Sequence, residues 1–125
     1  MAISATITQN SPGGDVEFSG KFFRVFGSIT FSGSYATGGD TFDLTAITKP
    51  LGTSGIPGGY SGATIPLVIY IQGINGYSYS YVKGTTRANG KIKVSTTANT
   101  ELAAGAYPAG VTGDTVVFEG LFPAD

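Results

Sequence analysis

Apolar and polar residues alternate along most of this chain with a period of two, which is typical of β-strands with one buried face. The alternation marks stretches that we expect to be strands, namely residues 3–8, 15–19, 21–32, 41–46, 77–81, 91–94 and 116–122. Residues 66–72 are instead continuously apolar and rich in β-branched side chains, which predicts a central strand. Together these patterns predict seven or eight strands.

The longest of these stretches, residues 21–32, carries apolar side chains on both faces. The odd-numbered positions from 23 to 31 share one face, while Phe22 and Phe26 lie on the other. We therefore expect its first half to be covered on both sides. Gly27 would permit a bulge or a bend where the covering changes.

Glycine, proline and asparagine mark the connections between the stretches. Asn89-Gly90, just before residues 91–94, predicts a hairpin with a type I′ turn, in which both turn residues have positive φ. Residues 49–63 form a Gly/Pro-rich loop without periodicity, and its length makes it a candidate contact loop. The one segment compatible with a helix, Glu101–Ala104, is limited to a single turn by the glycine and proline that follow it.

The strand count and spacing favour an all-β fold over any α/β arrangement. We predict one domain spanning residues 1–125, an antiparallel β-sandwich or small barrel without a substantial helix. Periodicity does not encode strand order, so a jelly roll and another Greek-key order both remain open.

Composition narrows the class of protein. Charged residues make up 12% of the 125 residues, against roughly 25% in a typical soluble domain. A net charge of −1 provides no long-range field for collecting nucleic acid, so we expect no nucleic-acid partner. No apolar run approaches the roughly 18 residues that span a membrane, and the alternating first residues lack the basic segment of a signal peptide. We therefore expect no membrane partner.

The residue types needed for common catalysis are missing. The chain has no histidine and no cysteine, which removes the usual general base and the thiolate metal sites. Asp40 and Asp43 point to opposite faces of a strand, and Asp15 and Glu17 flank an exposed turn, so we expect solvated carboxylates here. Gly38-Gly39-Asp40 is interpreted as a turn. We predict no catalytic residues, no metal, no cofactor and no enzymatic activity.

Aromatic side chains are the candidate contact residues. Tyr77, Tyr79 and Tyr81 share one face of their stretch, with lysines and an arginine nearby in the sequence. Such a stripe either packs against a sheet or a protein partner, or stacks a base or a sugar. We predict the following residues as protein contacts: Phe22, Phe26, Tyr77, Tyr79, Tyr81, and, in the long loop, Ile56 and Tyr60.

Three parts of the chain resemble small structural proteins of tailed bacteriophages. They are Val25–Leu44, with its Gly-Ser-Tyr-Ala-Thr-Gly-Gly-Asp ending, Gly76–Tyr81 followed by Asn89–Val94, and Glu101–Ala109 followed by Asp114–Phe118. Their order along about two thirds of the chain is similar to that in capsid decoration, or cement, proteins. The resemblance implies a β-sandwich on the outer surface of the virion that binds the major capsid protein, bridges its subunits and stabilises the shell. It also implies a homo-oligomer, most plausibly a trimer.

An alternative stays open. The chain could be a tail or host-recognition module that binds surface carbohydrate through its tyrosines.

Overall fold

The computed structural model describes residues 3–7, 16–19, 22–44 and 66–123, and the structural statements below concern these ranges. They contain strands and one short helix, in the order β1 (Ile3–Ile7), β2 (Val16–Ser19), β3 (Phe22–Phe31), β4 (Ser34–Tyr35), β5 (Asp40–Phe42), β6 (Val68–Gln72), β7 (Ser78–Val82), β8 (Gly90–Ser95), β9 (Gly105–Ala106), α1 (Ala109–Thr112) and β10 (Val116–Pro123). The predicted contact loop at residues 49–63 lies outside the described ranges.

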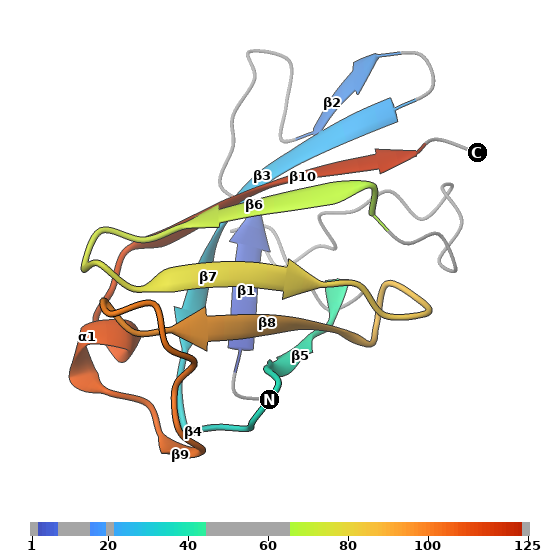
Figure 1. Cartoon of the computed structure of the whole chain (residues 1–125). Coiled ribbons are helices and arrows are strands. Elements are labelled where there is room, and N and C mark those ends of the chain that lie inside the picture. Colours follow the sequence, from blue (N-terminus) through green and yellow to red (C-terminus); the bar gives the residue numbers. More distant parts are fainter. Residues whose placement is uncertain (1–2, 8–15, 20–21, 45–65, 124–125) are drawn as a thin grey trace.

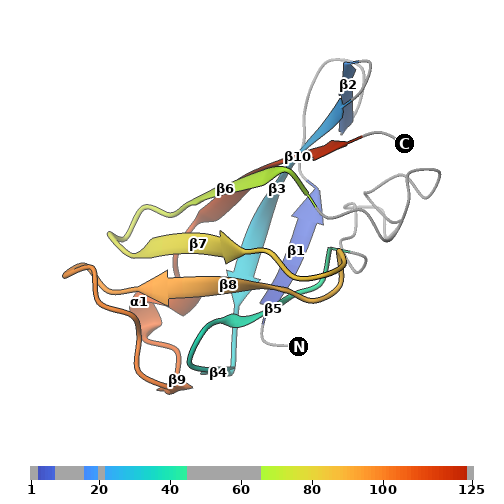
Figure 2. The ribbon, with the colours of Figure 1, turned by 45° about the vertical axis from the view of Figure 1, so that its right-hand side comes forward.

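The main strands form one antiparallel sheet in the order β1-β3-β10-β6-β7-β8-β5, and β2 pairs with β3 beside this path. β4 and β9 form a separate two-stranded pair. The sheet curls until its two end strands, β1 and β5, approach each other, so that it nearly closes into a barrel (Figures 1 and 2). The predicted all-β fold without a substantial helix is confirmed, since the helix found in the described ranges has four residues.

β3 changes its partner strand along one of its edges. β2 pairs with its first residues, Phe22–Val25, and β1 pairs with its last, Gly27–Phe31. The neighbouring strand thus changes near Gly27, but the predicted covering of both faces is wrong for the described side chains, since Arg24 is exposed and Phe26 lines an open hollow. The register with β10 on the other edge continues without interruption from residue 22 to residue 29, so Gly27 marks no bulge. The strand bends strongly (Figure 1).

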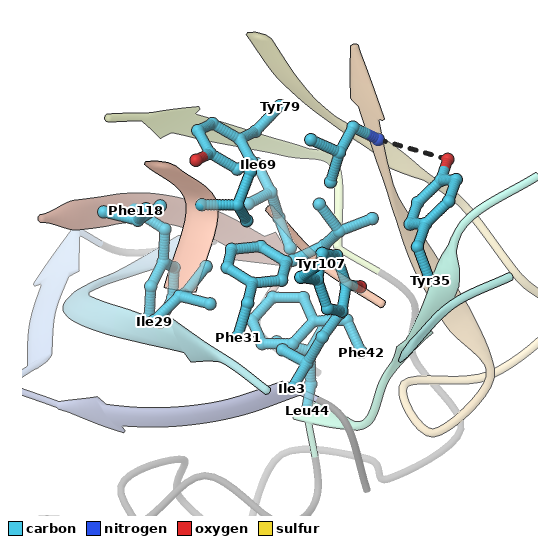
Figure 3. Packing of buried hydrophobic residues seen from close by; sticks show 14 of the residues in the cluster. Ile3, Ile29, Phe31, Tyr35, Phe42, Leu44, Ile69, Tyr79, Tyr107 and Phe118 are labelled. Atoms are coloured by element: carbon cyan, nitrogen blue, oxygen red, sulfur yellow. Dashed lines mark hydrogen bonds between the residues drawn. The ribbon is translucent and has the colours of Figure 1, made fainter. Parts of the chain in front are cut away.

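The inner faces of all the main strands pack into one core (Figure 3). Phe31 lies near its centre, with its ring stacked on Tyr79 at a centroid distance of 5.3 Å and tilted against Tyr107 at 5.4 Å. Phe42 meets Phe118 edge to face at 5.7 Å. Burial of these rings removes large apolar areas from water and dominates the packing free energy.

The β7–β8 hairpin exists, but its predicted type I′ turn is wrong. Neither Asn89 nor Gly90 has positive φ. The connection is longer, because the side-chain oxygen of Asn89 accepts hydrogen bonds from the backbone N–H groups of Thr85 and Thr86 at 2.9 and 3.0 Å. Gly90 already belongs to β8, and a Cβ there would lie 2.1 Å from the hydroxyl of Tyr81. The glycine is needed for this close approach and not for a positive φ.

The segment Glu101–Ala104, which was expected to form one helical turn at most, is not helical. Leu102 donates its backbone N–H to the carbonyl of Val94 at 3.0 Å, and Glu101 forms a bridge with Ser95, so this segment lines up beside β8. The short helix α1 begins after Pro108, which has extended geometry at the N-cap. Long-range pairing with β8 thus overrides a weak local helix preference.

The position of Phe31 predicts a large effect of its truncation. Phe31→Ala should reduce the free energy of unfolding by about 3–5 kcal/mol, because it leaves a cavity between two tyrosine rings. Urea denaturation followed by circular dichroism measures this value. Tyr70→Ala is the matched control, an outward aromatic on a strand, and should cost no more than about 1 kcal/mol. Equal losses for the two variants would contradict the assignment of the core.

Candidate functional site

Three adjacent strands, β3, β10 and β6, carry large side chains on the outside of the barrel. Phe26, Glu119 and Tyr70 are directly opposite one another in the strand register and form the middle row of this face. The rows on either side hold Val117 with Gln72, and Arg24 with Leu121 and Val68. We call these side chains the outer-face patch, which consists of Arg24, Phe26, Val68, Tyr70, Gln72, Val117, Glu119 and Leu121.

The patch is hollowed. A groove of about 360 Å³ runs between Phe26 and Tyr70, with Val117, Gln72 and Glu119 also in its wall. A smaller hollow of about 170 Å³ continues past Tyr70 and Glu119 toward Arg24. Grooves with mainly apolar walls and a few polar groups are the usual form of binding surfaces.

Two of the apolar side chains in this patch are largely in contact with solvent. Tyr70 is 68% exposed and Val117 is 50% exposed. On the neighbouring strands β7 and β8, the outward positions are instead mostly occupied by serine and lysine, namely Ser78, Ser80, Lys91, Lys93 and Ser95. The outside of the barrel therefore has an apolar part and a polar part, and an exposed apolar part marks a contact surface.

One ion pair lies within the patch. Nε of Arg24 is 3.2 Å from Oε2 of Glu119, and the two side chains keep 44% and 40% of their surface exposed. Exposed pairs of this kind contribute little to stability. Their charges remain accessible to a partner.

The predicted tyrosine stripe lies on the opposite, inner face of the sheet. Tyr79 is only 8% exposed, and Tyr77 and Tyr81 pack against the same core. Tyr79 is thus not available to a partner in this structure, and the sheet-packing interpretation of the stripe is the one that fits. The lysines at 91 and 93 point outward, away from the tyrosines, and Arg87 is buried with its guanidinium 5.2 Å from the ring centroid of Phe122. Alternation alone showed that the tyrosines share a face but not which way that face points.

Of the other predicted contact residues, Phe26 lies in the groove, on the face where the alternation put it. The structure does not describe the side chain of Phe22. Ile56 and Tyr60 lie outside the described residues. Tyr70 was not predicted as a contact, because it belongs to a continuous apolar run whose pattern does not separate inner from outer positions. Val117 was not predicted as a contact either.

The inward tyrosines also anchor turns at one end of the barrel. The hydroxyl of Tyr79 donates to Oδ2 of Asp114 at 2.8 Å. Oδ1 of Asp114 accepts the backbone N–H groups of Ile74 and Asn75 at 2.9 and 3.2 Å, which fixes the β6–β7 turn. Burial first, and then the bond to Asp114, raises the pKa of Tyr79.

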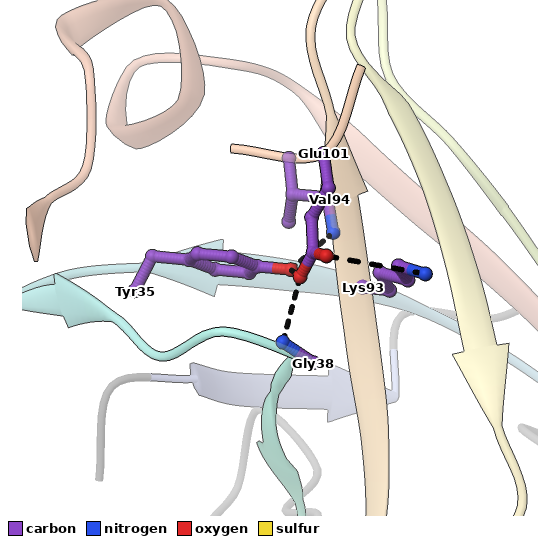
Figure 4. Close-up of polar contacts among 5 residues, drawn as sticks. All are labelled: Tyr35, Gly38, Lys93, Val94 and Glu101. Carbon is purple, nitrogen blue, oxygen red and sulfur yellow. Dashed lines mark hydrogen bonds and ion pairs between the residues drawn. The ribbon is translucent and has the colours of Figure 1, made fainter. Parts of the chain in front are cut away.

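Two further tyrosines are bonded in the same way. The Tyr35 hydroxyl donates to Oε2 of Glu101 at 2.7 Å, and that oxygen also accepts the N–H of Gly38 at 2.6 Å (Figure 4). The Tyr107 hydroxyl donates to Asp40. The expectation that Asp40 is a simple solvated carboxylate is therefore wrong, because the fold brings a tyrosine 67 residues away into contact with it.

These bonds shift the titration of the groups involved. Burial, assisted by the hydrogen bond to Glu101, raises the pKa of Tyr35 to about 12. The pKa of Glu101 is lowered, first by the N–H of Gly38 and then by the Tyr35 hydroxyl, with a smaller contribution from Lys93, whose Nζ is 4.0 Å away. These carboxylates act as structural acceptors.

In the described ranges, no three carboxylate, histidine or cysteine side chains gather where they could hold a metal ion. The same residues contain no helix that is long and apolar enough to cross a membrane. Comparison with protein-family models, curated proteins and solved structures found no match for this chain.

The lowered pKa of Glu101 predicts a pH-dependent contribution to stability. A carboxyl group whose folded pKa lies below its ordinary value of 4.5 stabilises the fold above that value and loses this effect as the pH falls through the folded pKa. Urea midpoints of the wild type and Glu101→Gln, measured from pH 7 to pH 3, should differ most at neutral pH and converge in acid.

Tyr35→Phe serves as the companion variant. It removes one hydrogen bond that lowers the pKa of Glu101, so the folded pKa should move back toward the ordinary value and the stability lost in acid should be smaller than in the wild type. If Glu101→Gln unfolds at the wild-type midpoint at neutral pH, Glu101 does not hold the Gly38 turn.

Proposed function

We propose that this chain is a structural protein that binds another protein through its outer-face patch, as a capsid decoration protein of a tailed phage binds the shell. The observation that carries the proposal is the exposed aromatic and apolar side chains around the groove, above all Tyr70 and Val117. Aromatic residues in such positions supply most of the binding free energy in protein interfaces.

The shape and composition of the patch support a protein partner. Three paired strands fix the backbone beneath its side chains, so little backbone entropy is lost when a partner covers them. Charged residues are few in the whole chain, and many copies on one shell would gain avidity from many modest contacts. A surface of this kind tolerates close neighbours.

The particular assignment rests on the resemblance of the three segments to small phage structural proteins. On that basis the partner is the major capsid protein, the location is the outer surface of the virion, and the chain is a homo-oligomer, with a trimer favoured. Each of these three points is part of the proposal.

The described carboxylates support a structural role over acid–base chemistry. Asp40, Glu101 and Asp114 each accept a tyrosine hydroxyl, and Glu119 pairs with Arg24. The alternative of a carbohydrate-binding module relied on the tyrosine stripe at 77–81. Because Tyr79 is buried, the geometry favours the protein-binding proposal.

The proposal predicts a high copy number in purified particles of the source phage. A denaturing gel calibrated against the major capsid protein should show hundreds of copies per particle, since decoration repeats with the symmetry of the shell. A few to a few dozen copies would place the chain in the tail and overturn the decoration proposal.

Rebinding to stripped particles tests the surface itself. Tyr70→Ser and Val117→Ser should each weaken rebinding by about tenfold or more, because they remove exposed apolar contacts. Val82→Ser is the matched control, since Val82 is an outward valine with 43% exposure on β7, away from the groove. Equal binding by Val82→Ser and Val117→Ser would exclude the outer-face patch as the interface.

A further inference from the structure

Glu119 stands between two aromatic side chains at the centre of the groove. In the strand register it is directly opposite Phe26 on one side and Tyr70 on the other. Side chains in directly opposite positions have Cβ atoms roughly 5 Å apart, so the carboxylate and both rings act on the same small volume. The Glu119 side chain keeps 40% of its surface exposed there.

An aromatic ring attracts a cation through its face, and a carboxylate attracts it through charge. A guanidinium group combines both, because it is planar, permanently charged and carries several N–H donors. Gln72, in the same groove wall, offers an amide oxygen as another acceptor, and Val117 offers an apolar surface for the aliphatic part of the side chain. The groove therefore presents the groups that an arginine side chain binds, namely a negative charge, two aromatic rings and an apolar wall.

Arg24 shows that a guanidinium already fits against this carboxylate. Its Nε reaches Oε2 of Glu119 from the side of the smaller hollow, next to Leu121 and Val68. The larger groove lies toward Val117 and Gln72. A second guanidinium can approach Glu119 from that side without displacing Arg24.

We propose that the larger groove of the outer-face patch binds an arginine side chain of the partner protein, between Phe26 and Tyr70 and against Glu119. This inference rests on the proposed function for the nature of the partner and adds the chemical group that the partner supplies. Neutral saccharides are less well matched, because they carry many hydroxyl groups that need hydrogen-bond partners. Among the residues that line the groove, Tyr70, Gln72 and Glu119 are the ones whose side chains can form hydrogen bonds.

The test is an NMR titration of the full chain with N-acetyl-L-arginine methylamide. Amide resonances of residues 26–27, 70–72 and 117–119 should shift, with a dissociation constant in the millimolar range. N-acetyl-L-citrulline methylamide has the same shape without the charge and should bind about tenfold more weakly. Tyr70→Ser should weaken binding of the arginine probe. Glu119→Gln should abolish the difference in affinity between the arginine and citrulline probes.

Glu101→Gln is the control variant, because it changes the net charge by the same amount at a site outside the groove. It should bind the arginine probe like the wild type. Equal binding of the arginine and citrulline probes, or shifts confined to other parts of the chain, would overturn the inference.

The same experiment would detect two other occupants of the groove, and either of them would overturn the inference. Shifts of the groove resonances with N-acetylglucosamine or glucose at the same concentrations would indicate a saccharide site. Shifts on dilution of the protein alone would indicate a second copy of the chain. The outcome is separable from the proposed function, since arginine binding and particle binding are measured independently.

Discussion

The structure depends on buried tyrosines whose hydroxyl groups are bonded to carboxylates. Tyr79 and Tyr107 pack their rings against Phe31 and donate to Asp114 and Asp40. Each residue thus contributes apolar area to the core and fixes a segment at the end of the barrel. A hydrogen bond to a charged group contributes about 1.5–3 kcal/mol, more than one between neutral groups. In a chain with few charges, these pairs connect the loops to the sheet.

Closure of a single sheet has a consequence for the outer surface. Because the inner faces fill one common core, every second residue of each strand must point away from it. On β7 and β8 these residues are mostly serine and lysine, which water solvates. On β3, β10 and β6 they include Phe26, Val117 and Tyr70. The three strands that carry apolar residues on both faces are neighbours in the sheet, although they are far apart in the sequence.

The periodicity predicted the long strands, but it placed β5 too late in the sequence, since this strand is Asp40–Phe42, and it did not indicate the two-residue strands β4 and β9. It also could not show where distant parts of the chain meet. The β7–β8 hairpin was predictable, but its turn was not. The turn depends on the hydrogen bond that the Asn89 side-chain oxygen accepts from the backbone and on the close approach of the Tyr81 ring to Gly90. The contacts of Asp40 with Tyr107 and of Asp114 with Tyr79 span 67 and 35 residues, and no local pattern signals them. Of the candidate surface, the outward position of Phe26 was predictable. Which strands lie beside β3 is a matter of topology, which alternation does not encode.

Glu119 makes the apolar patch selective. A partner that covers Phe26 and Tyr70 also covers the carboxylate between them, and removing a charge from water is costly unless an opposite charge comes with it. The ion pair with Arg24 compensates for part of this cost. A purely apolar partner would therefore bind poorly, whereas a partner that brings a cation would gain both the ion pair and the ring contacts. The same arrangement disfavours non-specific association through the exposed rings, which a chain with so little net charge does not otherwise prevent.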